Sequence, residues 1–263
     1  MIKLLGIPHD VHSSFLRGTA LAPPRIRLMH SDGSANAFTE KGIEIVEGDS
    51  FTDVGDLNLS GLSPEKAFKE IKNAVFQILK SGDRVLSLGG DHSISYPVIM
   101  AHVEKYGELN ILQIDAHGDL YENFEGNPFS HASPFARLLE SGKIKSLTQV
   151  GIRSLNSHQR EQIDKYEVRT IEMKDFNMNF LTELEGPLYL SLDLDVLDPA
   201  FAPGVSHYEP GGMTSRQLLD LIQGISGDIV GADIVEYNPV RDLHDMTAMV
   251  AYKLMKEIME KMK

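Results

Sequence analysis

Three side chains of types that commonly bind metals lie within five residues, at Asp115, His117 and Asp119. They follow the apolar residues 109–114, a run typical of a strand buried on both faces. Because side chains alternate along an extended chain, all three would point to one side if that geometry continues just past the strand. Two carboxylates and an imidazole gathered in a small volume repel one another or lack partners unless a cation lies between them. The segment therefore predicts a metal site.

Three further polar clusters also follow directly after apolar runs. They carry His92 after residues 84–88, Asp193 and Asp195 after residues 187–192, and Glu236 after residues 229–235. Taken alone, an acidic run is commonly a solvated loop, a Gly-Gly pair marks a turn, and a single histidine is more often packed than metal-binding. Their joint occurrence at strand ends favours metal binding, because ligand sites in parallel sheets lie beyond the carboxyl ends of the strands.

The predicted metal ligands share one property, a nitrogen or oxygen donor at a strand end, and they are His92, Asp115, His117, Asp119, Asp193 and Asp195. One ion could hardly use four carboxylates and two imidazoles, whereas two ions that share bridging carboxylates could. The sequence has no cysteine, which excludes thiolate ligands, and the imidazoles argue against calcium or magnesium. We therefore expect two Mn²⁺ ions, with nickel, cobalt and iron as alternatives.

The elements that must position these residues alternate between strand and helix patterns. We expect strands at 2–7, 84–88, 109–114, 146–150, 187–192 and 229–235, and helices at 64–80, 135–139, 215–226 and about 245–262. Ser63 and Pro64 mark the start of one helix, and a Thr214 to Gln217 capping box marks another. Such alternation predicts right-handed crossovers and a mostly parallel sheet. Since no linker divides the chain, the expected fold is a single α/β domain over residues 1–263, with three α/β/α layers.

Composition narrows the class of partner. The formal charge of −13 disfavours nucleic acid and anionic membranes and suits a small cationic ligand, although solubility explains much of such a charge equally well. No run approaches the roughly 18 apolar residues that a membrane helix needs. The first residues read as a strand and not as a signal peptide, so we expect a cytoplasmic location.

Several of these motifs resemble the signatures of the ureohydrolase family, which includes arginases, agmatinases and related amidinohydrolases. The matching segments are GGDHS at 89–93, DAHGD at 115–119 and SLDLDVLDP at 191–199, with further likeness at 13–18, 22–27, 130–133, 151–154 and 245–249. The resemblance covers nearly the whole chain and is greatest to plant-type arginases. It implies an arginase-type fold, a binuclear manganese cluster and, as in much of the family, a homo-oligomer of three or six subunits.

The resemblance also implies residue roles. One ion would be held by His92, Asp115, Asp119 and Asp193, and the other by Asp115, His117, Asp193 and Asp195. His131 would match the histidine that passes a proton to the leaving amine, and Glu236 the carboxylate that pairs with the substrate guanidinium. A carboxylate at a strand end can bind a planar guanidinium through two hydrogen bonds. The plainer alternatives are a salt bridge from Glu236 to Arg241, and a helix-capping role for the segment around His131.

The expected reaction is hydrolysis of a guanidino group to urea and an amine, with water activated between two divalent ions. L-Arginine is the favoured substrate, and agmatine, guanidinobutyrate and formiminoglutamate are the alternatives. Residues expected to bind the substrate are Asn127, Ser130 and Glu236, with Ser14 and Asn123 as further candidates near its carboxylate. A non-catalytic scaffold would be expected to lack some of these residues. A metal-dependent deacetylase is the other enzyme class considered, and Glu236 favours guanidine hydrolysis.

Some residues near the motifs are given lesser roles. Gly118 stands where several members of the family carry a bulkier residue, which leaves the shape of the pocket open. Asp91 and Asp198 are expected to orient the ligands from behind them. The remaining histidines are expected within helices or at surface and outer positions, at His9, His12, His30, His102, His158, His207 and His244.

Overall fold

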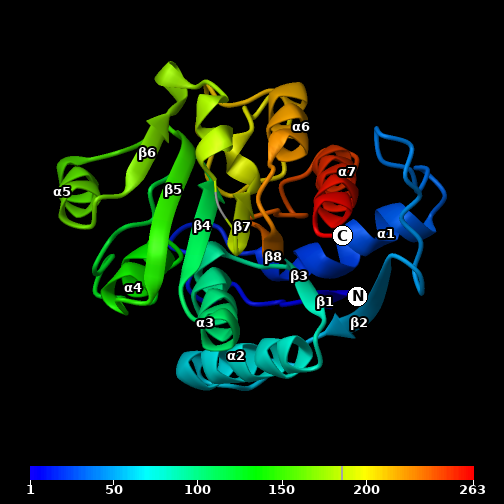
Figure 1. Ribbon diagram of the computed structural model, residues 1–263, viewed down its shortest axis with the longest axis horizontal. Helices are drawn as coiled ribbons and strands as arrows, with labels where there is room; N and C mark the ends of the chain where they lie inside the picture. The colour runs from blue at the N-terminus through cyan, green and yellow to red at the C-terminus, as the bar shows by residue number, and fades with distance from the viewer. Residues whose placement is uncertain (185) are drawn as a thin grey trace.

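The computed structural model describes residues 1–184 and 186–263, and an eight-stranded sheet lies at its centre (Figure 1). The strands are β1 (Ile2–Gly6), β2 (Phe51–Asp56), β3 (Arg84–Leu88), β4 (Leu109–Ile114), β5 (Ile144–Ile152), β6 (Arg169–Glu172), β7 (Leu188–Asp193) and β8 (Ile229–Val235). Their order across the sheet is β2-β1-β3-β8-β7-β4-β5-β6. Within the described residues, each neighbouring pair runs parallel. The predicted α/β fold is confirmed.

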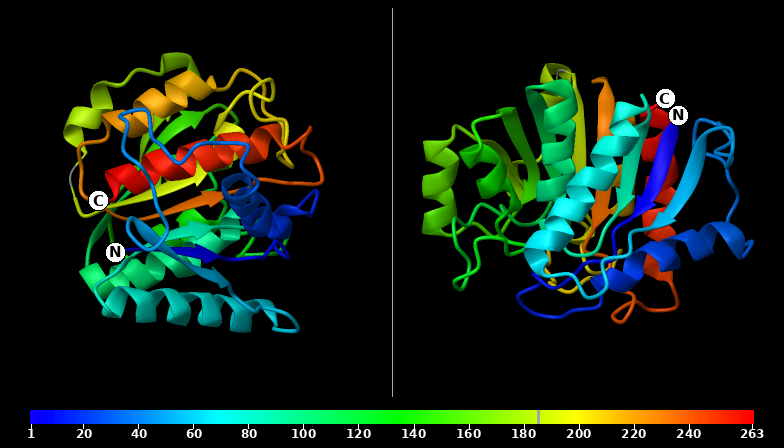
Figure 2. Two further views of the ribbon diagram at one scale, coloured as in Figure 1. Left: turned by 90° about the vertical axis from the view of Figure 1, so that its right-hand side faces the viewer. Right: turned by 90° about the horizontal axis from the view of Figure 1, so that it is seen from below.

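Helices cover both faces of this sheet. They are α1 (Ala22–Ser31), α2 (Pro64–Lys80), α3 (Ser95–Tyr106), α4 (Pro134–Glu140), α5 (Ser157–Lys165), α6 (Ser215–Gly224) and α7 (Met246–Lys261). One apolar core lies between the sheet and α1, α6 and α7, and a second lies between the sheet and α2, α3 and α4. Figure 2 shows α2 and α3 side by side over one face. Consecutive residues of β7 serve different cores, Tyr189 the second and Leu190 the first, as alternation along a strand requires.

Most of the predicted elements occur where the apolar patterns placed them. Strands β3, β4 and β8 and helix α2 have the predicted bounds, and β5 extends further than predicted at both ends. The capping box at the start of α6 is confirmed, since Thr214 Oγ1 accepts from Gln217 N at 3.1 Å and the Gln217 side chain bonds back to Thr214 N. The prediction of a single domain stays a prediction, and one continuous sheet supports it.

The sequence does not predict the two outermost strands or helix α1, and it indicates α3 and α5 only as helical patterns around His102 and His158. Strand β2 reads FTDVGD and β6 reads RTIE, and both are partly exposed. Edge strands have one neighbour and one solvent-facing side, so they need no continuous apolar run. Helix α1 has two prolines in its first turn, a signal compatible with a helix start that also suits a loop.

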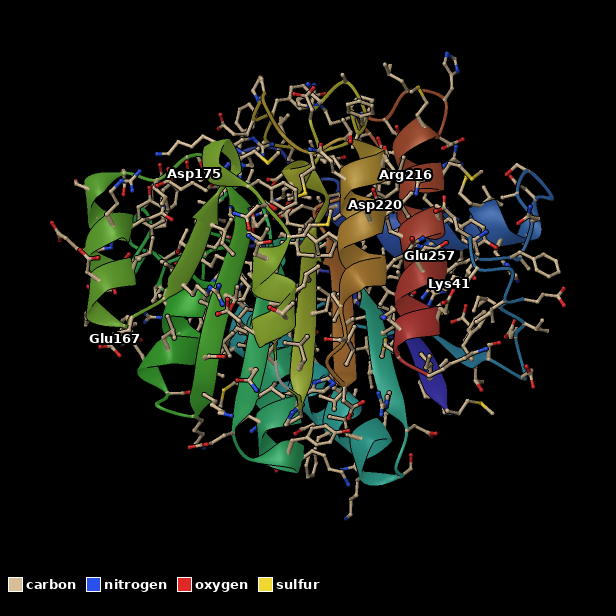
Figure 3. The ribbon with its side chains drawn as sticks, turned by 45° about the horizontal axis from the view of Figure 1, so that its top comes forward. Lys41, Glu167, Asp175, Arg216, Asp220 and Glu257 are labelled. Carbon is tan, nitrogen blue, oxygen red and sulfur yellow. The ribbon has the colours of Figure 1, made fainter. Side chains whose placement is uncertain are left out.

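The segment between α1 and β2 is held against α6 and α7 by polar contacts. Glu40 pairs with Arg216 of α6 at 2.6 Å, and Arg216 also lies 3.2 Å from Asp220. The backbone N–H of Glu40 donates to Glu257 Oε1 of α7 at 2.9 Å. Figure 3 shows the labelled side chains on this face, with Arg216 and Asp220 on α6 and Glu257 on α7. Exposed pairs of this kind each contribute at most about 1 kcal/mol, so they position the segment more than they stabilise the fold.

Among the described residues, no helix is long and apolar enough to span a membrane.

Candidate metal centre

The predicted site residues come from four strands that are consecutive in the middle of the sheet, β3, β8, β7 and β4. Their carboxyl ends meet at one edge, as parallel pairing requires. The turn after β3 depends on Gly90, because a Cβ atom there would collide with the carbonyl oxygen of His9. Close approach of these two backbone segments brings His92 to the same edge as Glu236 and the two loops that carry the predicted aspartate ligands.

The first ligand group surrounds the imidazole of His92. Its Nδ1 lies 3.1 Å from Asp115 Oδ2, 3.0 Å from Asp119 Oδ2 and 3.2 Å from Asp193 Oδ2. His92 is fully buried, and Nδ1 forms no hydrogen bond within the described residues. A buried nitrogen lone pair that faces three carboxylate oxygens is an arrangement that a cation completes.

The second ligand group lies beside the first and shares Asp115 with it. His117 Nδ1 is 2.9 Å from Asp195 Oδ2 and 3.7 Å from Asp115 Oδ1. Donor atoms of Asp115, His117 and Asp195 all lie within 4.8 Å of one another, as do those of His92, Asp115 and Asp119. The structure thus brings together all six predicted ligands as two overlapping groups, joined by a common carboxylate.

Hydrogen bonds from neighbouring side chains fix the orientations of the predicted metal ligands. His92 Nε2 lies 2.9 Å from Ser191 Oγ, and that hydroxyl donates to the buried carboxylate of Asp233 at 2.8 Å. Since the hydroxyl proton is used on Asp233, His92 Nε2 is the donor to Ser191, and Nδ1 is the nitrogen that faces the carboxylates, where it can bind a cation or, in the metal-free protein, a proton. The Gln113 amide donates to Asp115 Oδ2 at 2.7 Å.

Backbone N–H groups fix the remaining carboxylates in the same way. Asp193 Oδ1 accepts from the N–H of Asp195 at 2.8 Å, and Asp195 Oδ1 accepts from the N–H of Ala116 at 3.2 Å. The other oxygen of each carboxylate faces an imidazole of the ligand groups, Asp193 Oδ2 facing His92 and Asp195 Oδ2 facing His117.

Electrostatics of the ligand groups show the need for added positive charge. Burial, together with Asp195 and Asp115, raises the pKa of Asp193 well above its usual range. Burial and Asp115 raise the pKa of Asp119 to about 6. Burial alone would lower the pKa of His92, but the neighbouring carboxylates raise it well above 6.5. Without a cation the cluster must therefore hold protons to limit repulsion, and divalent ions can take their place.

His131 and Glu236 form a buried pair next to the ligands. His131 Nδ1 lies 2.8 Å from Glu236 Oε1, and Nε2 lies 2.8 Å from Ser14 Oγ. The same Glu236 oxygen accepts from the backbone N–H of His92 at 2.9 Å. The alternative of a salt bridge from Glu236 to Arg241 is not what the structure has, since Arg241 contacts Tyr208.

The pair is also electrostatically coupled. Burial opposes a charged imidazole, but the Glu236 carboxylate raises the pKa of His131 to about 9. Burial likewise opposes ionisation of Glu236, and His131 lowers its pKa below the usual value. His131 is therefore protonated at neutral pH in the metal-free protein.

Two of the site residues have a strained backbone. Asp119 has φ 48° and Glu236 has φ 62°, in the left-handed region that non-glycine residues seldom occupy. Such conformations are disfavoured, and they recur at functional sites where the surroundings hold them in place. Their occurrence at Asp119, a predicted metal ligand, and at Glu236, the predicted partner of the guanidinium group, agrees with a functional site.

A cavity of about 210 Å³ opens over the cluster. Its lining includes His117, Asp119, Asp193, Asp195, His131 and Glu236, and Ser14 also lines it. Further lining residues that were not among the predicted site residues are Tyr121, Phe124, Ala132, Ser154, Gln159 and His207, of which Ala132 and Ser154 lie in segments that resemble the family. We expected His207 at the surface or at an outer position. Its ring centroid instead lies 5.2 Å from that of His131 and 6.1 Å from that of His117.

Asn127 and Ser130, which were expected to bind the substrate, are not among the residues that line this cavity. The Asn127 amide contacts His12 Nδ1 at 3.0 Å, and its oxygen accepts from the N–H of Phe129. Ser130 is buried and accepts from the N–H of Ala132 at 3.3 Å. Both side chains support the loop that carries His131, and a direct contact with substrate stays a prediction for them.

Asp91 and Asp198 lie behind and beside the site. Asp91 is fully buried and accepts from the backbone N–H groups of His12 and Ser93, which fixes the turn that delivers His92. Asp198 accepts from the N–H groups of Ala200 and Gly211 and so holds the loop after β7.

Comparison with known proteins agrees with this geometry. A model of the arginase family matches residues 1–260. The chain is 46% identical to arginase 1, mitochondrial, of Arabidopsis thaliana over 275 residues, covering 98% of this chain and 80% of the relative. It is 34% identical to an agmatinase of Bacillus anthracis over 269 residues, covering 98% of this chain and 90% of that one.

Among solved structures, the arginase from Medicago truncatula superposes with a TM-score of 0.95 at 46% identity, covering 99% of this chain and 87% of that one. The resemblance inferred from the motifs is confirmed by a family match over nearly the full length and by plant arginases of high identity. The chain belongs to the arginase family.

Proposed function

We propose that this protein hydrolyses L-arginine to L-ornithine and urea with the help of two divalent cations. The observation that carries the proposal is that two overlapping ligand groups and the His131–Glu236 pair lie together beneath and along the wall of one cavity. The names of the plant relatives, which are arginases at 46% identity, support arginine as the substrate.

The six ligands fit two cations of the manganese type. They offer four carboxylates and two imidazoles without a thiolate, and one carboxylate, Asp115, belongs to both groups. We propose manganese, with nickel, cobalt and iron as alternatives. When bound, two such cations supply the reaction with a water molecule whose pKa is lowered towards neutrality.

The protein's own groups bind and orient the substrate. Glu236 lies on the cavity wall beside the ligands, and its carboxylate can pair with the guanidinium group and hold its carbon towards the metal ligands. Burial of Glu236, which is 4% exposed, strengthens such a charge-assisted contact because water is excluded.

His131 is placed to move the proton that the reaction needs. Water attacks the guanidinium carbon, and the bond from that carbon to Nε of arginine breaks. Urea is released, and the departing amine, which becomes the side-chain amino group of ornithine, takes up a proton. His131 lines the same cavity, and in the metal-free protein the Glu236 carboxylate raises its pKa to about 9. As a general acid, His131 can donate its proton to the departing amine. A proton from the consumed water can then protonate His131 again.

A urea-release assay with purified, manganese-loaded protein tests the proposal. Arginine, agmatine, guanidinobutyrate and formiminoglutamate are compared at equal concentration, each with manganese and with nickel; formiminoglutamate is scored by formamide release. We expect the highest kcat/KM for arginine and no activity after chelation. Agmatine is the second candidate because an agmatinase is 34% identical over nearly the whole chain. Release of urea from none of these substrates would refute the proposal.

Two further proposals concern the protein's setting. We propose a homo-oligomer, a trimer or hexamer, which sedimentation of the metal-loaded protein would measure. A cytoplasmic location also remains a proposal, and the plant relatives carry mitochondrial names.

A further inference from the structure

A second cavity lies next to the loop that carries His131, bordered by the first turns of α2 and α3 and by residues 127–129. Its volume is about 620 Å³, against about 210 Å³ for the cavity over the metal cluster, and within the described residues the two cavities share no lining residue. We call it the aromatic groove. The side chains that matter for its chemistry are His12, Glu65, Phe68, Tyr96, Asn127 and Phe129.

Three aromatic rings pack together on the wall of the groove. The ring centroid of Phe68 lies 5.7 Å from that of Phe129 in an edge-to-face arrangement, and the Tyr96 centroid lies 6.2 Å from each of them. Tyr96 and Phe129 are only partly buried, so both rings keep surface that a ligand can reach. Aromatic faces attract cations and pack well against flat or apolar groups.

The charge of the wall favours a cation over an anion. Glu65 is the charged side chain that lines the groove, and no lysine or arginine does so in the part of the chain that the structure describes. His12 is neutral at pH 7, because burial and the neighbouring His9 lower its pKa to about 4. Pro64, the first residue of α2, has no N–H to offer an anion. A cation would therefore meet both a carboxylate and aromatic faces, whereas an anion would meet the carboxylate unopposed.

His12 connects the groove to the loop that carries the predicted proton donor. Its carbonyl oxygen accepts from the backbone N–H of His131 at 3.2 Å, and its own N–H donates to Asp91 Oδ2 at 3.0 Å. On the ring side, the Asn127 amide lies 3.0 Å from His12 Nδ1. A ligand that packs against His12 and Phe129 thus contacts both partners of this junction, so the groove and the position of His131 are mechanically linked.

We propose that the aromatic groove is a regulatory site for a small primary amine in its ammonium form with an aromatic or apolar body, and that its occupation changes turnover through the loop that carries His131. The volume of the groove is in the range of sites that bind small molecules. The effect on turnover rests on the proposed function, whereas binding in the groove does not.

Calorimetric titration of the manganese-loaded protein tests binding. Phenethylammonium is the probe, with phenylethanol as its neutral counterpart and phenylacetate as the anionic one. We expect phenethylammonium to bind at least about threefold more tightly than phenylethanol, because only the cation gains from the rings and the carboxylate. Phenylacetate should bind least. Equal affinity for the cation and the anion, or no binding of the cation, overturns the proposal.

Two substitutions locate the bound probe. Tyr96→Leu removes one ring and keeps an apolar side chain, and Glu65→Gln removes the charge; each should raise the Kd of phenethylammonium at least about twofold at low salt. Glu70→Gln is the matched control, since it removes the same charge from an exposed position of α2 outside the groove and should leave Kd unchanged. A wild-type Kd in both groove variants, or an equal change in the control, overturns the proposal. Should Tyr96→Leu not fold, the exposed position Glu65 decides.

Steady-state kinetics test the regulatory effect. With arginine far above its KM, the probe cannot act by competing in the cavity over the metal cluster. Phenethylammonium at about ten times its Kd should then change kcat at least about twofold in the wild type and less in Tyr96→Leu. An unchanged wild-type kcat, or an effect that disappears as arginine is raised, overturns the proposal.

The outcome is separable from that of the proposed function. If the wild type releases no urea from arginine, the proposed function fails, and calorimetry alone decides whether the groove binds the amine. If the wild type hydrolyses arginine and neither its kcat nor the calorimetric signal responds to the probe, only the role of the groove fails.

Discussion

Replacement of Glu236 by glutamine should lower the proton affinity of His131 in the metal-free protein. Glu236 Oε1 lies 2.8 Å from His131 Nδ1, and both residues are almost fully buried. This contact is the largest of the effects that raise the pKa of His131 from 6.5 to about 9 against burial, and the charges of Asp91 and Asp119 add to it. With Glu236→Gln the largest of these effects is gone and burial remains, so we expect the pKa of His131 to fall well below 9.

The size of the effect follows from the two pKa values. A rise from 6.5 to about 9 corresponds to about 3 kcal/mol, at about 1.4 kcal/mol for each factor of ten in proton affinity. Because the pKa of His131 is higher in the folded protein than in the unfolded chain, this stabilisation is fully present below about pH 6.5. It is lost as the pH rises through about 9. Wild type and variant should therefore differ most in stability at pH 6 and least above pH 9.

Two measurements on metal-free protein check this expectation. NMR titration of the His131 ring gives its pKa in each protein, and urea unfolding at pH 6 and pH 9.5 gives the pH-dependent part of the free energy of unfolding. His102 serves as an internal control, because its pKa of about 4 results from burial without a carboxylate partner. A His131 pKa that stays near 9 in the variant would show that Glu236 is not its cause.

Three further perturbations address the metal centre and the proton donor. Asp119→Ala removes one carboxylate from the group around His92, so metal analysis should show loss of about one of two manganese equivalents with near loss of turnover; two retained equivalents would contradict the ligand assignment. His131→Asn should keep both ions and reduce kcat by about 10²–10⁴-fold, as expected for loss of a general acid, and unchanged turnover would remove His131 from the mechanism. Chelation should lower the midpoint of thermal unfolding. Manganese at about 100 times its Kd should raise the free energy of unfolding by about 2.7 kcal/mol for each site that it fills, whereas a midpoint independent of manganese would argue against a site formed in the folded state.

Much of the fold could be predicted because its central strands are buried on both faces. Continuous apolar runs at β3, β4 and β8 leave a clear signal in the sequence, and their bounds agree with those predicted. The edge strands β2 and β6 give no such signal, since each has only one strand neighbour. Their pairing is decided by backbone hydrogen bonds to β1 and β5, which any residue except proline can form.

The sequence by itself indicated which six side chains would gather as candidate metal ligands, because parallel strands bring their carboxyl ends to one edge and the spacing along each strand sets the facing side. Only the tertiary structure decided the wall of the cavity. His207 comes from the loop after β7 and Gln159 from α5, and neither has a local pattern that distinguishes it from a surface residue. Asn127 has the chemistry of a substrate ligand, yet its amide contacts His12. Which long-range segments lie side by side depends on packing across the whole fold, and no short stretch of residues encodes that.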